Sequence, residues 1–119
     1  MRNYIEVEGI LLGKWKNRLD IYVLGKDNNT YTEIYLTPNE TIDLLIAIIK
    51  VFENIINDEL IALDKEKEEA KKKKRKKELE DIKERQVALT ELAGNLLKTR
   101  DVLMHYYERI ADLLPYRDD

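Results

Sequence analysis

Hydrophobic and polar residues alternate with a period of two along the first third of the chain, in three short runs. This period is typical of strands that pack one face on a core and expose the other to water. The runs cover residues 4–8, 19–24 and 30–36. Their apolar positions are Ile5, Val7, Leu19, Ile21, Val23, Ile34 and Leu36. We therefore predict a three-stranded antiparallel meander.

Two connections in this region carry turn signals. Residues 25–29 predict a tight hairpin between the second and third runs, because Gly and Asn tolerate the positive φ that such turns require. Residues 10–12 follow the first run without alternating. We expect them either to extend the first strand or to form a bulge at Gly9 or Gly13.

The outward face of this sheet would carry tyrosines and carboxylates. Tyrosines on a sheet are found in single-strand stacking platforms, but the carboxylates here would repel phosphate. Two alternatives suit the pattern better: contact with a protein partner, or a solvated face of cross-strand Tyr and Glu pairs. The candidate contact residues on this face are Tyr4, Glu6, Glu8, Tyr22, Tyr31, Glu33 and Tyr35, next to Asp20.

A strong helix start follows the third run. Thr37 can cap the helix, Pro38 fits its first position, and Glu40 can close a capping box. Apolar residues then recur every three or four positions. They are Ile42, Leu45, Ile46, Ile49, Phe52, Ile56, Leu60 and Leu63, with Leu44, Ile48, Val51 and Ile55 widening the stripe. We expect this helix to lie between the sheet and another helix.

The second helix is predicted near the C-terminus, where spacings of three and four alternate without a slip as in a coiled coil. The positions are Leu79, Ile82, Gln86, Leu89, Ala93, Leu96, Arg100, Leu103, Tyr107, Ile110 and Leu114. Gln86 and Arg100 interrupt this seam. These interruptions and the apolar excess at residues 42–56 together suggest that two chains associate, since a monomer would leave one apolar flank in water. Pro115 should end the helix.

A run of seven cations lies between the helices: Lys71, Lys72, Lys73, Lys74, Arg75, Lys76 and Lys77. Ala70 is the only apolar residue between Leu63 and Leu79, and the heptad phase shifts by two positions across the run. Both facts predict a chain reversal at residues 70–78. A single continuous helix that pairs with a second chain is the alternative, because Lys, Arg and Glu favour helices.

The predicted fold is α+β, a three-stranded antiparallel meander packed on a long antiparallel helical hairpin that resembles a coiled coil. One domain is expected for 119 residues. Its predicted parts are the meander at 1–37, the first helix at 38–69, the basic tip at 70–78, the second helix at 79–114 and a tail at 115–119.

Composition excludes several classes of chemistry. The chain has no cysteine, which excludes disulfides, thiolate zinc sites and a cysteine nucleophile. His105 is the only histidine and is expected on the surface. The sequence predicts no metal site, no cofactor and no catalytic residue. It contains neither an apolar stretch long enough to span a membrane nor a signal-peptide pattern, so we expect a soluble, cytoplasmic protein without membrane contact.

Basic residues supply the remaining candidates for binding. The net charge is -3, but residues 64–86 carry 11 basic and 8 acidic groups and are therefore net positive. The basic tip could contact nucleic acid, contact an acidic protein or serve as a solvated turn. A second cluster, Lys14, Trp15, Lys16 and Arg18, combines cations with the only tryptophan, which would either be exposed for contact or cover an end of the sheet.

These features favour a non-catalytic, dimeric protein-interaction factor that acts through its sheet face and edge and its basic tip. One alternative is an accessory nucleic-acid-binding protein that uses the tip and the Trp15 cluster. Another is a small inhibitor that occupies a basic groove through its acidic sheet face.

Overall fold

The computed structural model describes residues 4–27 and 31–117. Its α+β class confirms the prediction, with an antiparallel sheet and two long helices. The chain divides into two compact units. Unit 1 consists of Met1–Leu45 and His105–Asp119, and unit 2 consists of Ile46–Met104. The single domain expected from length stays a prediction.

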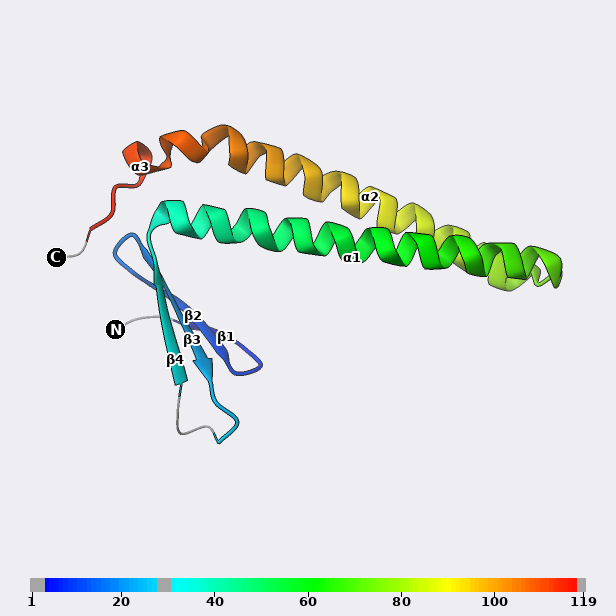
Figure 1. Ribbon diagram of the computed structural model, residues 1–119, viewed down its shortest axis with the longest axis horizontal. Coiled ribbons are helices and arrows are strands. Elements are labelled where there is room, and N and C mark those ends of the chain that lie inside the picture. Colours follow the sequence, from blue (N-terminus) through cyan, green and yellow to red (C-terminus); the bar gives the residue numbers. More distant parts are fainter. Residues whose placement is uncertain (1–3, 28–30, 118–119) are drawn as a thin grey trace. The chain divides into compact units, whose positions relative to one another are not determined.

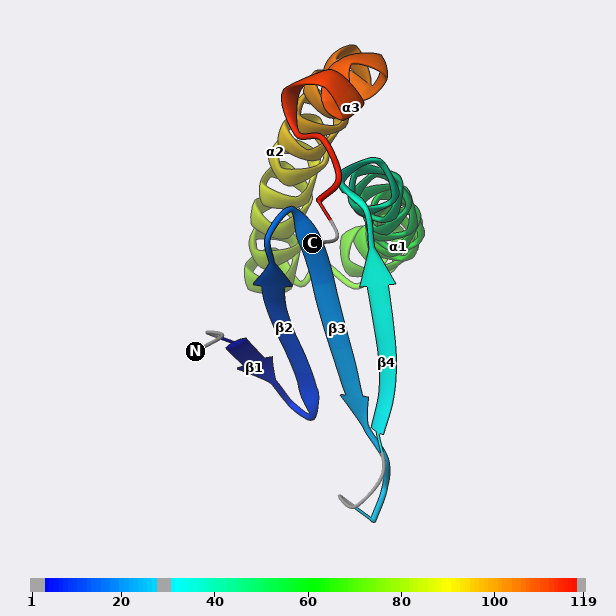
Figure 2. The same cartoon turned by 90° about the vertical axis from the view of Figure 1, so that its left-hand side faces the viewer.

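The sheet of unit 1 has four strands, so the predicted count of three is wrong. The strands are β1 (Tyr4–Val7), β2 (Ile10–Trp15), β3 (Arg18–Leu24) and β4 (Tyr31–Leu36), in the spatial order β1-β2-β3-β4 (Figure 2). All neighbours are antiparallel.

The extra strand arises from a tight turn at Glu8 and Gly9. Val7 pairs with Ile10, and the two residues between them have φ angles of 42° and 84°. Positive φ at both central residues is the geometry that joins twisted strands most directly. Both expectations for residues 10–12 are therefore wrong: the chain reverses at Glu8 and Gly9, residues 10–12 begin the antiparallel strand β2, and Gly13 pairs regularly with Asp20. In the predicted turn at residues 25–29, Asn28 and Asn29 lie outside the described residues.

Strand register separates the side chains into two faces. The pairs Leu12↔Ile21 and Ile21↔Ile34 belong to one of them, and Tyr22↔Glu33 belongs to the other. We call the first the aliphatic face. Its aliphatic residues are Ile5, Val7, Ile10, Leu12, Leu19, Ile21, Val23, Ile34 and Leu36, and the register also places Lys14 and Thr32 on it. We call the second the tyrosine face. It carries Tyr4, Glu6, Asp20, Tyr22, Tyr31, Glu33 and Tyr35, and the register also places Leu11, Trp15, Arg18 and Leu24 on it.

Burial of the aliphatic face is incomplete. Leu12, Leu19, Ile21 and Leu36 are half-buried. The other five side chains are exposed: Ile5 at 69%, Val7 at 57%, Ile10 at 40%, Val23 at 38% and Ile34 at 41%. The expected burial is therefore wrong for Ile5, Val7, Val23 and Ile34, and Ile10 joins them on the exposed part of the face.

Helix α1 (Pro38–Lys72) begins at the predicted capping box. The Glu40 carboxylate accepts the backbone N–H of Thr37 at 3.0 Å, and the Glu40 N–H donates to the Thr37 hydroxyl at 3.3 Å. The bond from the Thr37 N–H lowers the pKa of Glu40. Two further hydrogen bonds join the start of α1 to Tyr107. The Asn39 side-chain amide donates to the Tyr107 carbonyl at 3.3 Å, and the Tyr107 hydroxyl donates to the Asp43 carboxylate at 3.2 Å.

The C-terminal part of unit 1 is formed from short pieces. After α2 (Lys76–Tyr106) come the 3-10 helix η1 (Tyr107–Arg109) and helix α3 (Ile110–Leu113). The second helix was predicted to continue to residue 114. The regular helix α2 instead ends at Tyr106, and short helical pieces follow it.

In unit 2, α1 and α2 run in opposite directions from a turn at Lys73–Arg75 (Figure 1). The chain reversal is confirmed, and the single continuous helix is wrong. The Arg75 N–H bonds the Ala70 carbonyl at 3.0 Å and the Lys74 N–H bonds the Lys71 carbonyl at 3.3 Å, with a φ of 56° at Lys74. This is a Schellman motif with lysine at the left-handed position that usually holds glycine.

The seam between the two helices follows the predicted heptads on α2. Each seam residue of α2 from Leu79 to Leu103 is buried or half-buried, whereas the residues between them are exposed. Gly94 lies within α2 with open space around it. The best-buried cluster contains Leu63, Ala70 and Ile82.

On α1 the seam differs from the prediction. The α1 seam in unit 2 runs at spacings of three and four through Ile46, Ile49, Glu53, Ile56, Leu60, Leu63, Lys67 and Ala70, all buried or half-buried, and Glu59 and Ala62 beside it are also half-buried. Glu53 therefore occupies the place predicted for Phe52, which is exposed. Leu45 also lies outside the seam.

Both polar interruptions of the α2 seam find partners on α1. Gln86 donates to Asp64 at 2.8 Å. Arg100 forms an ion pair with Glu53 at 2.5 Å, and these side chains are only 20% and 16% exposed. Because α1 supplies a partner for both Gln86 and Arg100, the two interruptions do not require a second chain, although Arg100 Nε and Glu53 Oε1 stay buried without a hydrogen bond.

Removing one member of the Glu53–Arg100 pair should weaken the hairpin strongly. Arg100→Ala leaves a half-buried carboxylate without its cation, and we expect a loss of about 3 kcal/mol in the free energy of unfolding. The double variant Glu53→Leu with Arg100→Leu should recover most of that loss. Urea unfolding measures both. Arg85→Ala, which breaks the exposed pair with Glu59, should cost about 0.5 kcal/mol. An equal loss for Arg85→Ala and Arg100→Ala would contradict the role of burial.

Candidate interaction surfaces

Tyr22 is the centre of an aromatic cluster on the tyrosine face. Its ring meets those of Tyr4, Tyr31 and Tyr35 edge to face, with centroid distances of 5.5, 5.7 and 6.4 Å. Such pairs stabilise one another beyond the area they bury. The rings therefore pack mainly on each other and do not present a row of flat faces for stacking bases.

Arg18 and Asp20 form a second fixed arrangement on this sheet. The Arg18 guanidinium donates to both Asp20 carboxylate oxygens, at 2.6 and 3.2 Å, and Asp20 is fully buried. The guanidinium carbon also lies 4.1 Å from the centroid of the Tyr35 ring. The hydrogen bond to Asp20 raises the pKa of Arg18. Arg18 was a candidate contact residue, but its guanidinium is paired with Asp20 within the sheet.

Tyrosine and carboxylate also pair along β4. The Tyr35 hydroxyl donates to the Glu33 carboxylate, and this bond raises the pKa of Tyr35. The pKa of Tyr22 is raised first by its hydrogen bond with Tyr4. Glu6 lies exposed on β1, and Glu8 lies in the turn after it. Apart from Glu8, the predicted partner-contact residues thus lie on one face of the sheet. Several of them already form ring contacts or hydrogen bonds with each other.

The Trp15 cluster lies at the β2–β3 turn. Trp15 is 41% exposed, the Lys16 ammonium lies 5.9 Å from its ring centroid, and Lys16 has a φ of 57°. Asn17 donates to the carbonyl of Pro115 at 2.7 Å and so ties the turn to the C-terminal segment. A non-glycine residue with positive φ is uncommon, and here it orients the turn that carries Trp15.

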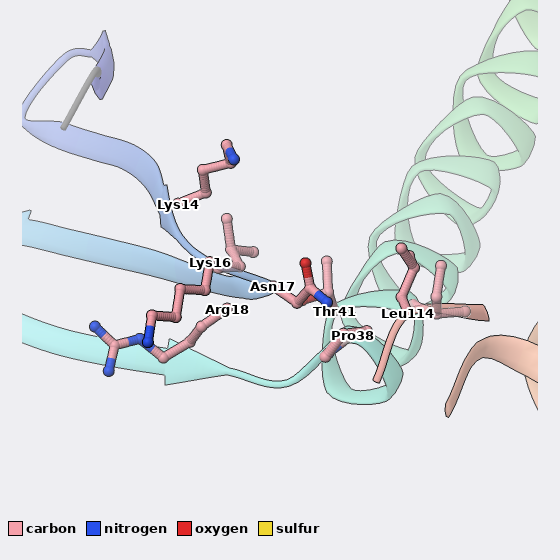
Figure 3. Close-up of a pocket in the computed structure, with 9 residues that line it drawn as sticks. Lys14, Lys16, Asn17, Arg18, Pro38, Thr41 and Leu114 are labelled. Carbon is pink, nitrogen blue, oxygen red and sulfur yellow. The ribbon is translucent and has the colours of Figure 1, made fainter. Parts of the chain in front are cut away.

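A pocket of about 250 Å³ lies beside this turn, within unit 1. It is lined by Lys14, Lys16, Asn17, Arg18, Leu19, Pro38, Thr41, Ile42 and Leu114. Figure 3 shows the charged ends of Lys16 and Arg18 directed away from Pro38 and Leu114. The cations therefore do not converge on its apolar floor, and the pocket lacks the arrangement that would hold an anionic ligand.

All seven cations of the basic tip are exposed. Lys71 and Lys72 end α1, Lys76 and Lys77 begin α2, and the turn supplies the other three cations. Glu68 lies 3.7 Å from Lys71, and Glu78 lies 3.3 Å from Arg75. Within residues 4–27 and 31–117, the other five cations have no carboxylate within ion-pair distance. They are Lys72, Lys73, Lys74, Lys76 and Lys77.

Sequence reasoning missed the exposed aliphatic face as a surface, because it assigned that face to the interior. It also missed the two internal ion pairs. The Arg-x-Asp spacing of residues 18 and 20 was a usable signal, since residues two apart on a strand share a face. No comparable local signal connects Glu53 with Arg100, which are 47 positions apart.

Other kinds of site find no support in the part of the chain that the structure describes. It holds no group of three His, Asp or Glu side chains placed to bind a metal ion. None of its helices has both the length and the apolar character to cross a membrane. His105 packs edge to face on Tyr106, with ring centroids 5.0 Å apart.

Comparison with known proteins adds no relative. No protein-family model matches the sequence, and searches of curated proteins and of solved structures found no match either.

The tyrosine cluster should be visible in an alkaline titration. The pKa values of Tyr22 and Tyr35 are raised in the folded chain, so their contribution to stability is fully present below about pH 10 and is lost as pH rises through the folded values. We expect phenolate absorbance to show a late-titrating group that Tyr22→Phe reduces. If all tyrosines of the folded wild type ionise together like free tyrosine, the packed cluster is contradicted.

Proposed function

We propose that this chain is a non-catalytic, dimeric protein-interaction factor that binds a second protein through the aliphatic face of its sheet. The observation that carries the proposal is the exposure of five aliphatic side chains on that face. Antiparallel sheets commonly pack one face and expose the other. On the tyrosine face, tyrosines and carboxylates pair with one another, whereas the five exposed aliphatic side chains of the other face are purely apolar, so we expect the aliphatic face to bind the partner.

The size of the patch supports a specific contact. Large contiguous apolar patches mark interaction sites more often than ordinary surface. Burying the exposed parts of these five aliphatic side chains against a partner contributes about 5 kcal/mol to the free energy of binding, before the entropic costs of association are subtracted. A partner with an apolar strand or helix face matches this surface.

The strand edges and the basic tip extend the proposed contact. β1 and β4 are the edges of the sheet, so each leaves backbone groups for a further strand. The tip offers cations to an acidic part of a partner. Trp15 is exposed enough to contribute to the same recognition.

A matched pair of substitutions tests the face. Val7→Lys changes the aliphatic face and Glu6→Lys changes the tyrosine face at the neighbouring residue of β1. With nuclease-treated host extract, we expect wild type and Glu6→Lys to capture the same protein and Val7→Lys to lose at least tenfold. Circular dichroism checks that both variants fold. Loss only with Glu6→Lys would instead support an inhibitor that binds a basic groove, and would overturn the proposal.

Nucleic-acid binding is the second candidate function, favoured by the five tip cations that lack a carboxylate. It predicts that Lys72, Lys73, Lys76 and Lys77 changed together to Gln reduce affinity for a single-stranded oligonucleotide. Four phosphate contacts give a slope of about -3 for log affinity against log salt. Lys50→Gln with Lys98→Gln, which lies outside the tip, is the control. If the affinity for the oligonucleotide changes neither with salt nor with the tip substitutions, nucleic-acid binding through the tip is contradicted.

A further inference from the structure

The exposed apolar side chains of unit 2 gather in the half that lies away from the tip. On α1 they are Ile48, Val51, Phe52 and Ile55, and on α2 they are Leu92, Leu97, Val102 and Met104. The Glu53–Arg100 pair lies between these two segments. Closer to the tip, the exposed large apolar residues of α1 and α2 are Ile61 and Val87. We call the first group the open half of the hairpin.

The α1 residues of the open half form a second stripe. Ile48, Val51 or Phe52, and Ile55 follow one another at three or four positions, which aligns them along one side of a helix. Val51 lies two residues from both Ile49 and Glu53 of the buried seam, or about 200° around the helix. Val51 therefore faces away from α2. Ile48, Phe52 and Ile55 each lie one residue, or about 100°, from a seam residue, and α2 leaves all four exposed.

The charge of this segment restricts what can cover the stripe. From Ile46 to Asn57 the only charged residues are Lys50 and Glu53, and Glu53 is neutralised by Arg100. The stripe offers no charged group for a polar partner to bind. An apolar, equally uncharged helix fits it, and the same face of a second copy has that chemistry.

The spacing of the stripe is also self-complementary. Read in either direction, it runs three, one and three positions from Ile48 through Val51 and Phe52 to Ile55. An antiparallel copy therefore brings Ile48 opposite Ile55 and Val51 opposite Phe52. A twofold dimer requires a patch that matches itself in this way.

The basic tip decides between the two orientations. Parallel copies would place two runs of seven cations side by side, whereas antiparallel copies place them at opposite ends. The Debye length is about 8 Å at physiological salt, so only the parallel arrangement suffers strong repulsion. We propose that two copies of this chain dimerise through Ile48, Val51, Phe52 and Ile55 of α1, antiparallel, with their basic tips apart.

This inference rests on the proposed function for the expectation of a dimer, and gives the dimer its surface. Ile55→Glu and Ile61→Glu form a matched pair, since both isoleucines are exposed on α1, at 56% and 58%. In sedimentation equilibrium of the full chain, wild type and Ile61→Glu should be dimers. Ile55→Glu should dissociate at least a hundredfold more easily, with its helix content unchanged by circular dichroism.

The outcomes separate this inference from partner binding. A monomeric wild type, or equal dissociation of both Glu variants, overturns the inference and leaves partner capture by the aliphatic face standing. Dissociation by Val7→Lys but not by Ile55→Glu also overturns it, because the sheet would then join the copies. If Ile55→Glu does not fold, Val51→Lys provides the same comparison.

Orientation is tested with a spin label, because the chain has no native cysteine. Lys65→Cys labels α1 on the tip side of the stripe. Antiparallel copies place the two labels about 40 Å apart along the helix axis, from 27 residues at 1.5 Å each. Parallel copies place them about 10 Å apart, the usual spacing of packed helices. A short distance contradicts the antiparallel dimer.

Discussion

Helix α1 has apolar residues on two sides, and the hairpin covers only one of them. The seam with α2 buries Ile49, Ile56, Leu63 and Ala70 and leaves the stripe at Ile48 and Ile55 in water. Within unit 1 the sheet shows the same imbalance, because its aliphatic face is only partly buried. Both surfaces expose apolar side chains whose burial would be favourable. Our functional proposals follow from this exposed apolar surface.

Polar residues in the structure serve mainly to fix the fold. Arg100 and Gln86 interrupt a seam that would otherwise be apolar, and each is matched by a specific residue of α1. On the sheet, Arg18 binds both oxygens of the buried Asp20. The Glu53–Arg100 and Asp64–Gln86 contacts join the two helices at defined positions. The charges left over are concentrated at the basic tip.

Much of the fold could be predicted from the sequence, since periodicity and local turn chemistry carry it. The capping box at Thr37 and the α2 seam are examples, because each depends on residues close in sequence. The fourth strand was missed because the Glu8–Gly9 turn resembles a bulge when Ile10 and Leu11 do not alternate. The exact position of the reversal at Lys74 could not be predicted, because no glycine marks it. The place of Glu53 in the seam could not be predicted either, because its partner Arg100 is 47 positions away in the sequence.

The central claim is that the second stripe of α1 is covered in the working protein. Solvent paramagnetic relaxation of isoleucine methyl groups, measured on the full-length chain by NMR, tests it most directly. The account predicts that Ile48 and Ile55 are shielded from a soluble relaxation agent while Ile61 is strongly affected. Equal relaxation of all three methyl groups would contradict it.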